Sequence, residues 1–234
     1  MNSINTSILT LLLLIAVEGF GQSNDKGTLF SVNYSYGLPM GSLNESVSNG
    51  SPRGFGVELS WKIAEKWRLG PSFGYQDYYQ KNGRELLKPN ATTDISAVVS
   101  TSIQPYTFMA TTTFLPLADR TTKLQPFFQA GAGGAMIAYR QLWGMFDVAN
   151  TNAFTFAAAA GAGLQYQIGD AKKMSLFGSA LYNFIPYNRS DLTTINSIRI
   201  QAGIRIKLEN NNSGYYEQTP DPRYYQNNNY RYLP

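Results

Sequence analysis

A chain of 234 residues with 43% hydrophobic and 14% aromatic residues can fold into one sizeable domain, which excludes general disorder. The net charge of +4 comes from scattered Lys and Arg residues that form no basic run, so it does not indicate a nucleic-acid partner. Because the sequence contains no Cys, disulfides, thiolate metal sites and an acceptor Cys for a lipid anchor are excluded.

The first 21 residues have the organisation of a signal peptide. The apolar run from Ile8 to Val17 has the length of a signal-peptide core and is too short to cross a bilayer of about 30 Å as a helix. Small residues at Gly19 and Gly21 predict cleavage after Gly21. Residues 1–7 contain no Lys or Arg, so a buried N-terminal helix stays open as the alternative.

Three segments alternate regularly between apolar and polar residues, as strands do when their two faces meet different surroundings. They are residues 54–63, 154–168 and 196–208. In the third, Ile198, Ile200 and Ile204 lie on one face, opposite Arg199 and Gln201. These segments predict two-faced β-strands.

Weaker alternation predicts further strands. They cover residues 28–37, 67–75, 124–140 and 174–184. The fourth strand in chain order is expected within Ile103 to Leu115, although Pro105 cannot donate a ladder hydrogen bond, and residues 95–101 could extend it. The expected total is eight strands, plus or minus one hairpin.

Alternation alone would also suit a soluble barrel whose apolar face points inward. Here the polar faces are rich in Gly, Ser, Thr and Gln, which fit inside a narrow barrel, while the apolar faces carry Phe, Tyr, Trp and Ile. Aromatic residues also gather near strand ends, as in interfacial girdles, although strands are commonly enriched in them. These are Tyr34, Tyr36, Trp61, Trp67, Tyr75, Tyr166, Tyr182 and Phe184. We therefore expect the apolar face to meet lipid.

The expected connections alternate between short and long. Short ones cover 64–66, 117–123 and 169–173, and longer ones cover 40–53, 79–102, 141–152 and 185–194. Outer-membrane barrels have short periplasmic turns and longer extracellular loops, and an even strand number places both termini in the periplasm. The prediction is an all-β fold: an eight-stranded antiparallel transmembrane β-barrel over residues 22–208 in the bacterial outer membrane, with both mature termini periplasmic.

The strand pattern from Thr28 to Leu208 resembles the small outer-membrane β-barrel family of Bacteroidota-type bacteria, similar to OmpX and the barrel domain of OmpA. The resemblance includes the segments LQPFFQAGAGG (124–134) and SIRIQAGIRIKL (197–208). The resemblance implies a fold and does not imply one specific function, since such barrels include adhesins, enzymes, plugs and structural subunits. The chain departs from the family by continuing beyond Leu208 instead of ending there on an aromatic residue.

Residues 209–234 form a tail of different composition, rich in Asn, Tyr and Pro and without apolar periodicity. Its tyrosines are of a type enriched at protein interfaces. They are Tyr215, Tyr216, Tyr224, Tyr225, Tyr230 and Tyr232. Two interpretations stay open: a periplasmic segment that orders on a protein partner, and a solvated tail.

The residue types argue against catalysis. The sequence has no His, which excludes Ser-His-Asp hydrolysis and His-ligated metal sites in their usual forms. A paired-carboxylate mechanism needs two converging acids, and Glu58 is the one acid assigned to a lumen-facing position. The GAGG segment at 131–134 lies within a strand pattern and not between a strand and a helix. We therefore expect no catalytic residues, cofactor, metal or small-molecule substrate.

Charged residues on the predicted lumen face are expected to form a structural network. They are Glu58, Lys62, Arg68, Arg199, Arg205 and Lys207. Four of them map to the periplasmic ends of their strands, with Glu58 near mid-barrel and Arg199 nearer the outside. An eight-stranded barrel holds little beyond its own side chains, so we expect these charges to pair and to leave no pore.

Two functional hypotheses follow. The preferred one is a structural or accessory subunit of a larger outer-membrane assembly, which contacts partners through the barrel surface and the tail. The alternative is a self-standing surface barrel for adhesion or envelope integrity. A small diffusion channel would require more strands than the pattern predicts.

Overall fold

The computed structural model describes residues 27–90, 93–118, 122–169, 173–189 and 192–208. The predicted signal peptide (1–21) and the tyrosine-rich tail (209–234) lie outside the described residues.

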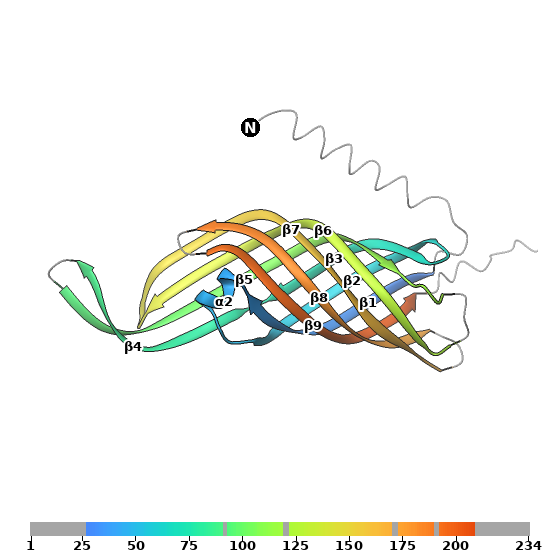
Figure 1. Ribbon diagram of the computed structural model, residues 1–234, viewed down its shortest axis with the longest axis horizontal. Coiled ribbons are helices and arrows are strands. Elements are labelled where there is room, and N and C mark those ends of the chain that lie inside the picture. The colour runs from blue at the N-terminus through green and yellow to red at the C-terminus, as the bar shows by residue number, and fades with distance from the viewer. Residues whose placement is uncertain (1–26, 91–92, 119–121, 170–172, 190–191, 209–234) are drawn as a thin grey trace, which may run out of the picture.

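Nine strands follow one another along the described chain (Figure 1). They are β1 (Thr28–Met40), β2 (Ser51–Ala64), β3 (Trp67–Gln76), β4 (Tyr78–Asn90), β5 (Thr93–Phe114), β6 (Leu124–Trp143), β7 (Phe146–Ile168), β8 (Met174–Arg189) and β9 (Leu192–Leu208). One short helix, α2 (Ser42–Ser46), lies between β1 and β2. None of the helices in the described part of the chain has the length and apolar character needed to cross a membrane.

The sheet closes into a barrel through its first and last strands. β1 pairs with β9 from Thr28 against Leu208 to Met40 against Asn196. Around the sheet the order is β3-β2-β1-β9-β8-β7-β6-β5-β4, and β3 also pairs with β5. Every pairing is antiparallel, which confirms the all-β antiparallel class. The described chain enters and leaves the barrel at the same end, which we call the turn end (Figure 1).

The expected count of eight strands needs correction, because one strand position is divided in two. β3 pairs with β5 over residues 106–114, and β4 pairs with β5 over residues 93–103. The two strands therefore lie end to end along one edge of β5, separated by Asp77. Nine strands occupy eight positions around the barrel.

The location of the fourth strand and the long loops also need correction. The expected loop 79–102 consists mostly of β4 and the first part of β5, so the expected strand at 103–115 is only the later part of β5. The expected loops 141–152 and 185–194 are likewise mostly strand. These segments escaped prediction because their apolar residues, such as Val99, Ile103 and Ile185, are buried inside and reverse the apolar-outside pattern of the other strands.

Four strands extend beyond the others at the end opposite the turn end. β8 pairs with β7 only from Ala158 onward, whereas β6 pairs with β7 up to Phe146. β4 and the first part of β5 continue in the same direction, and Figure 1 shows their hairpin projecting away from the barrel. We call the outer parts of β4 to β7 the projecting sheet.

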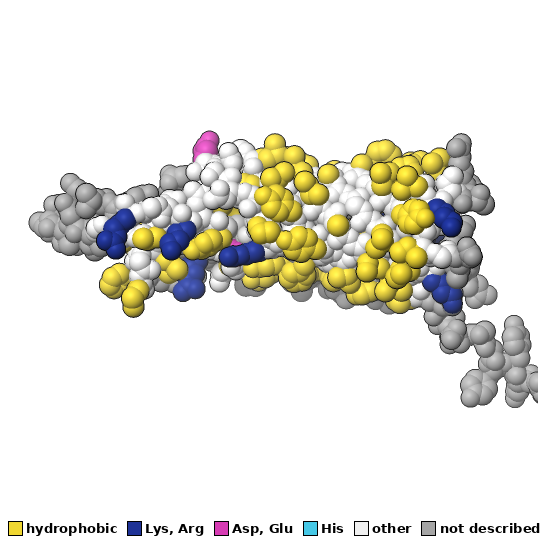
Figure 2. Space-filling view, turned by 90° about the horizontal axis from the view of Figure 1, so that it is seen from below, with side chains coloured by type: hydrophobic (Ala, Val, Ile, Leu, Met, Phe, Trp, Pro, Cys, Tyr) yellow, Lys and Arg dark blue, Asp and Glu magenta, His cyan; other side chains and the backbone are white. Residues whose placement is uncertain are grey.

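Large apolar side chains cover the outside of the barrel, and small or polar ones fill the inside. Exposed examples are Phe30, Val32, Phe55, Phe108, Phe128, Phe156, Leu164, Ile200 and Ile204. Buried polar examples are Ser31, Ser35, Glu58, Thr107, Thr111, Gln129, Gln165, Ser179, Gln201 and Arg205. Figure 2 shows the hydrophobic side chains along the barrel, with Lys and Arg toward both ends. The predicted orientation of the two faces is confirmed.

Aromatic pairs mark both ends of the apolar surface on β3 and β5. Trp67 and Phe114 lie 4.7 Å apart between ring centroids near the turn end, and Tyr75 and Tyr106 lie 5.0 Å apart toward the opposite end. The stretch from Trp67 to Tyr75 extends about 27 Å along the strand. With a strand tilt of about 40°, this gives an apolar height slightly above 20 Å, close to the band of outer-membrane barrels.

Candidate functional site in the barrel lumen

The lumen contains three layers of side chains. At the turn end an arginine lies between two phenylalanine rings, and in the middle polar groups surround a small cavity. Toward the projecting sheet, apolar side chains and helix α2 form a plug. Each layer is held by different chemistry.

Arg205 anchors the turn-end layer. Its guanidinium carbon lies 4.2 Å from the centroid of the Phe127 ring and 4.3 Å from that of Phe177. Its Nη1 donates a hydrogen bond of 2.8 Å to Oε1 of Gln165. A Cβ at Gly163 would lie 2.4 Å from the Phe127 ring, so this glycine makes room for the aromatic side chain in the narrow barrel. Small residues on the inner face of the barrel therefore leave room for a few large side chains.

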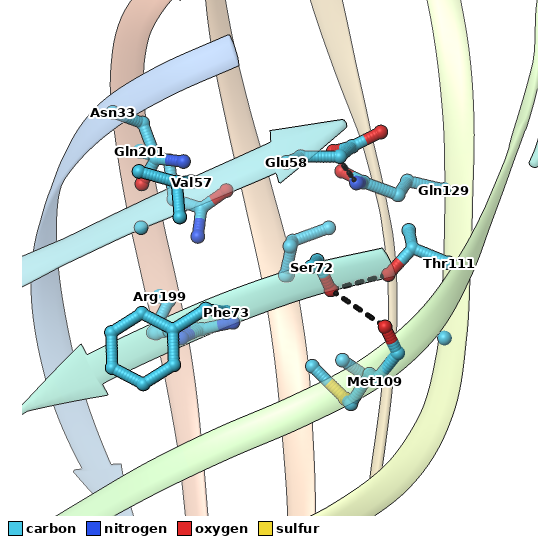
Figure 3. Close-up of a pocket in the computed structure, with 15 residues that line it drawn as sticks. Asn33, Val57, Glu58, Ser72, Phe73, Met109, Thr111, Gln129, Arg199 and Gln201 are labelled. Carbon is cyan, nitrogen blue, oxygen red and sulfur yellow. Dashed lines mark hydrogen bonds between the residues drawn. The ribbon is translucent and has the colours of Figure 1, made fainter. Parts of the chain in front are cut away.

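Glu58 lies above this layer and is buried, with 8% of its surface exposed. Its Oε2 accepts a hydrogen bond of 2.7 Å from Nε2 of Gln129 (Figure 3). Arg205 and Arg68 are near enough to stabilise the carboxylate electrostatically. A carboxylate in this position needs such compensation, because burial removes its hydration.

A cavity of about 30 Å³ lies beside Glu58. On one wall the Oγ of Ser72 and the Oγ1 of Thr111 are 2.6 Å apart, and Ser72 donates to the Met109 carbonyl oxygen at 3.4 Å (Figure 3). Arg199 lines the cavity from β9 (Figure 3). The volume suits one or two water molecules and is far below that of a small-molecule site.

Arg199 occupies a niche of its own, with 6% of its surface exposed. A Cβ at Gly74 would lie 2.4 Å from its Nη1 and 2.7 Å from Oγ1 of Thr107, so the glycine provides the space for the guanidinium. Tyr78, which is 1% exposed, interacts electrostatically with Arg199 from β4. Arg199 therefore belongs to the upper wall of the cavity and not to the layer around Arg205.

The plug consists of α2 and the apolar side chains around it. Leu43 and Val47 have no exposed surface, and they belong to the same buried cluster as Ile137 and Ile195. The Oγ of Ser42 donates to the Thr194 carbonyl oxygen at 2.9 Å and accepts a bond of 3.1 Å from the Thr194 backbone N–H. The β1–β2 connection therefore folds into the mouth of the barrel and is fastened to β9.

The structure brings only part of the expected charge network together. Glu58 and Arg205 meet in the lumen, and Arg68 lies close enough to act on Glu58 while donating a bond of 3.0 Å to the Gly27 carbonyl oxygen. Lys62 is exposed. Lys207 is half-buried, and a Cβ at Gly27 would lie 3.0 Å from its Cε. The six tyrosines proposed for partner binding lie outside the described residues.

A second polar cluster lies where β3 gives way to β4. Arg53 Nη1 and Asp77 Oδ2 are 3.2 Å apart, and Oδ1 of Asp77 accepts a bond of 2.9 Å from Ser102 Oγ. The Arg53 guanidinium carbon lies 5.2 Å from the centroid of the Tyr79 ring. Ser51 Oγ also donates to the Asp77 carbonyl oxygen. The sequence pattern did not indicate this junction, because residues 79–102 were expected to form a loop.

The plug was missed as well, although the sequence contains a signal for it. Ile195 has the same odd numbering as Ser197 and Arg199, so a regular strand places it inside the barrel. An isoleucine on an otherwise polar inner face indicates that the lumen becomes apolar at that level.

The described part of the chain shows no group of three His, Cys, Asp or Glu side chains arranged to hold a metal. The hydrogen bonds around Glu58 and Arg205 connect strands, and the rings of Phe127 and Phe177 pack against the guanidinium. The arrangement observed is suited to holding a barrel closed.

No family model matches the chain, and no curated protein sequence matches it. Among solved structures, the crystal structure of Neisserial surface protein A is similar over 78% of this chain and 97% of that chain, with 14% identity and a TM-score of 0.53. The fold is that of a small outer-membrane β-barrel.

Other outer-membrane proteins align with lower scores. A major outer membrane protein of Thermus thermophilus covers 77% of this chain and 99% of its own, with 10% identity and a TM-score of 0.47. OprG of Pseudomonas aeruginosa covers 79% and 97%, with 11% identity and a TM-score of 0.45. At these identities the likeness concerns the fold alone.

Proposed function

We propose that the chain is a non-enzymatic barrel of the OmpX and OmpA-barrel type of Bacteroidota-type bacteria, resident in the outer membrane, that works by contact outside the membrane. The observation that carries this proposal is the contrast between a filled lumen and a projecting sheet. Little space is left inside for transport, while four strands extend beyond the apolar surface.

The filling of the lumen argues against a diffusion channel. Leu43 and Ile195 are fully buried in the plug, and Phe127 is fully buried at the turn end. The cavity between these layers measures about 30 Å³. Barrels of eight strands enclose little more than their own side chains. In planar bilayers we expect no open-channel steps from the purified full chain, and large, reproducible steps would overturn this part of the proposal.

The orientation follows from the ends of the strands. Short turns and both ends of the described barrel lie at the turn end, which we assign to the periplasm. The projecting sheet then faces the outside of the cell.

The absence of native Cys makes this orientation directly testable. Asn82→Cys in the projecting hairpin should react with a membrane-impermeant maleimide on intact cells, whereas Thr122→Cys beside a turn should react only after the outer membrane is opened. The reverse pattern would refute the assignment.

The projecting sheet offers a means of contact. The outer part of β4 pairs with β5 on one side, and β7 pairs over residues 146–157 with β6 on one side. Backbone groups at such strand edges can pair with an added strand from another protein. We propose that the sheet engages external ligands, as in a self-standing adhesion or envelope-integrity barrel.

Trimming the β4–β5 hairpin tests the contact function. Joining Lys81 to Ser100, which face each other in register, through a short Gly-containing turn removes the tip while keeping β3 and most of the barrel. We expect the trimmed barrel to fold and cells carrying it to adhere less to surfaces that bind cells with the full chain. Equal adhesion would contradict the contact role of this hairpin.

A second proposal concerns the tail, and its basis is composition. Six tyrosines between Tyr215 and Tyr232 would give a periplasmic segment large contact groups for a protein partner in an outer-membrane assembly. Deleting residues 209–234 should then remove proteins that copurify with the full chain in mild detergent. An unchanged set of copurifying proteins would contradict the accessory-subunit role.

A further inference from the structure

The outward face of β5 changes chemistry abruptly beyond Tyr106. Toward the turn end it presents Phe108, which is 53% exposed. In the other direction, Tyr106 donates to Gln104 at 3.3 Å, Gln104 donates to Ser102 at 3.1 Å, and Ser102 donates to Asp77 at 2.9 Å. This chain of hydrogen bonds marks the level at which apolar contacts give way to headgroups and water.

Three cations gather just beyond this level, and we call Arg53, Lys81 and Arg140 the cation cluster. Arg140 on β6 is in register with Ser102 on β5, which is in register with Tyr79 on β4. Lys81 follows two residues after Tyr79 and is exposed on the same face, as Arg140 is.

The spacing of the cluster suits a single headgroup. Neighbouring strands lie about 4.8 Å apart and residues on one face repeat about every 7 Å along a strand, so the backbones of Lys81 and Arg140 lie within roughly 10 Å of Tyr79. The Arg53 guanidinium reaches the same tyrosine ring, 5.2 Å from its centroid. The long side chains of all three residues can therefore converge over Tyr79.

Asp77 offsets part of the positive charge of the cluster. Asp77 contacts Arg53 through Nη1 at 3.2 Å, while the Arg53 side chain remains 60% exposed and that of Asp77 is 10% exposed. Counted by themselves, the three cations and this carboxylate carry two net positive charges, and Arg140 makes a further interaction of its own. Arg84, also exposed, lies further along β4.

An aromatic surface lies directly on the membrane side of the cluster. Phe55 contacts Tyr75 at 5.5 Å and Phe73 at 5.9 Å between ring centroids, and Phe73 contacts Phe108 at 5.0 Å. Phe55 and Phe108 are about half exposed. Figure 2 shows Lys and Arg side chains of one barrel end lying next to hydrophobic ones. A molecule that satisfies both surfaces must have an anionic head and apolar chains.

We propose that this face of β2 to β6 binds a lipid of the facing leaflet that carries a phosphate in its headgroup. The phosphate sits among Arg53, Lys81 and Arg140, and the acyl chains lie on the Phe55, Phe73 and Phe108 surface. Guanidinium groups match phosphate oxygens with paired donors, and the Lys81 ammonium adds a point charge. The inference rests on the proposed membrane placement of the barrel.

Lipid selectivity of the full chain in bilayers tests the proposal. The chain is reconstituted in phosphatidylcholine, and the association of spin-labelled phosphatidic acid is compared with that of spin-labelled phosphatidylcholine. We expect the native chain to prefer phosphatidic acid about fivefold and each of R53Q, K81Q and R140Q to lower the preference about 1.7-fold. The triple variant should show nearly equal association, and an undiminished preference in it would overturn the proposal.

A matched variant separates this site from general attraction. K62Q, K123Q and K207Q together remove the same charge from the turn end and should leave most of the preference intact. An equal loss in both triple variants would refute a specific site. The charge-preserving R53K and R140K pair should retain more of the preference than the R53Q and R140Q pair, and a complete loss of preference in the lysine pair would count against a site that binds phosphate by charge.

A check of folding and insertion separates failure of the lipid site from failure of the proposed outer-membrane placement. Each variant is checked by the shift in gel mobility between heated and unheated samples. If the native chain itself does not insert into bilayers, the outer-membrane assignment fails. If all chains insert but selectivity is independent of the cluster, the lipid site alone fails.

Discussion

The two ends of the lumen are closed by different chemistry. At the turn end, Arg205 connects Phe127 and Phe177 to Gln165 and lies near Glu58, all on strands of the barrel. At the other end, apolar side chains of a connecting segment, led by Leu43, fill the mouth. The first closure is part of the wall, whereas the second is attached to it.

This difference implies unequal tolerance of change. In a buried polar network, loss of one member leaves its partners unsatisfied, which costs more than the lost contact itself. An apolar plug loses contact area in proportion to what is removed and can partly collapse around the gap. Substitutions at the turn end should therefore be the more damaging ones, and four variants test this ranking.

Arg205→Met should have the largest effect. The variant keeps a long side chain between the two rings but removes the charge near Glu58 and the bond to Gln165. We expect a loss of about 3–5 kcal/mol in the free energy of unfolding, because a buried carboxylate is left without its strongest compensating charge. Urea unfolding of the barrel in lipid or detergent measures it.

A second substitution provides the control. Glu58→Gln in the Arg205→Met background should recover most of the loss, since a neutral amide needs no counter-charge, and the two effects should be strongly non-additive. A double variant as unstable as Arg205→Met alone would show that the two groups do not depend on each other.

Leu43→Ala should come next, with a loss of about 2–3 kcal/mol if α2 packs as a true core element. Asn44→Ala, on the exposed side of the same helix, should change the unfolding free energy by less than about 0.5 kcal/mol. The urea midpoints of the two variants, compared with that of the native chain, measure these losses. A loss below about 1 kcal/mol for Leu43→Ala would mean that the plug is loosely seated and that the two ends differ even more than proposed.

Ser42→Ala should cost about 1 kcal/mol, the usual contribution of a partly buried hydrogen bond. It removes the attachment of α2 to Thr194 and leaves Leu43 in place. Hydrogen exchange of the amides at 43–47 should accelerate, while that of the β9 amides near Arg205 should not. Unchanged exchange in α2 would show that apolar packing alone holds the plug.

Arg53→Gln should have the smallest effect on stability, less than about 1 kcal/mol. Its ion pair with Asp77 involves a side chain that is 60% exposed, and exposed pairs contribute little. Unfolding at low and high salt measures the contribution, which should shrink as salt rises. A loss above about 2 kcal/mol would mean that the junction between β3 and β4 depends on this pair.

The sequence predicts well the part of the barrel that carries the apolar outer surface, for a physical reason. Where a strand separates the apolar outer surface from a filled lumen, its two faces meet opposite environments, and residues such as Ile198 and Arg199 alternate accordingly. In the first part of β5 the apolar residues Val99 and Ile103 are buried, whereas Ser100 and Ser102 lie on the opposite face, so the apolar-outside pattern of the barrel is reversed there. For this reason β4 and the first part of β5 were interpreted as a loop.

The candidate site was predictable to a lesser degree. Alternation places Glu58 and Arg205 in the lumen, but it does not say that Phe127 and Phe177 would enclose the arginine. That contact depends on the register between strands and on the space left by Gly163, which pairs with Phe127 across β6 and β7. Register is a property of the closed sheet and is not visible in any single segment.

The pairing of β1 with β9 also affects the order in which the barrel folds. Its partners, such as Thr28 and Leu208, are about 180 positions apart, whereas most other neighbouring strands are joined by hairpins. Contacts between such distant parts of a chain carry the largest loop-closure entropy and form slowly. We therefore expect this seam to form last, after the hairpins, so that a chain cut short before β9 exposes the edges of β1 and β8 and tends to aggregate.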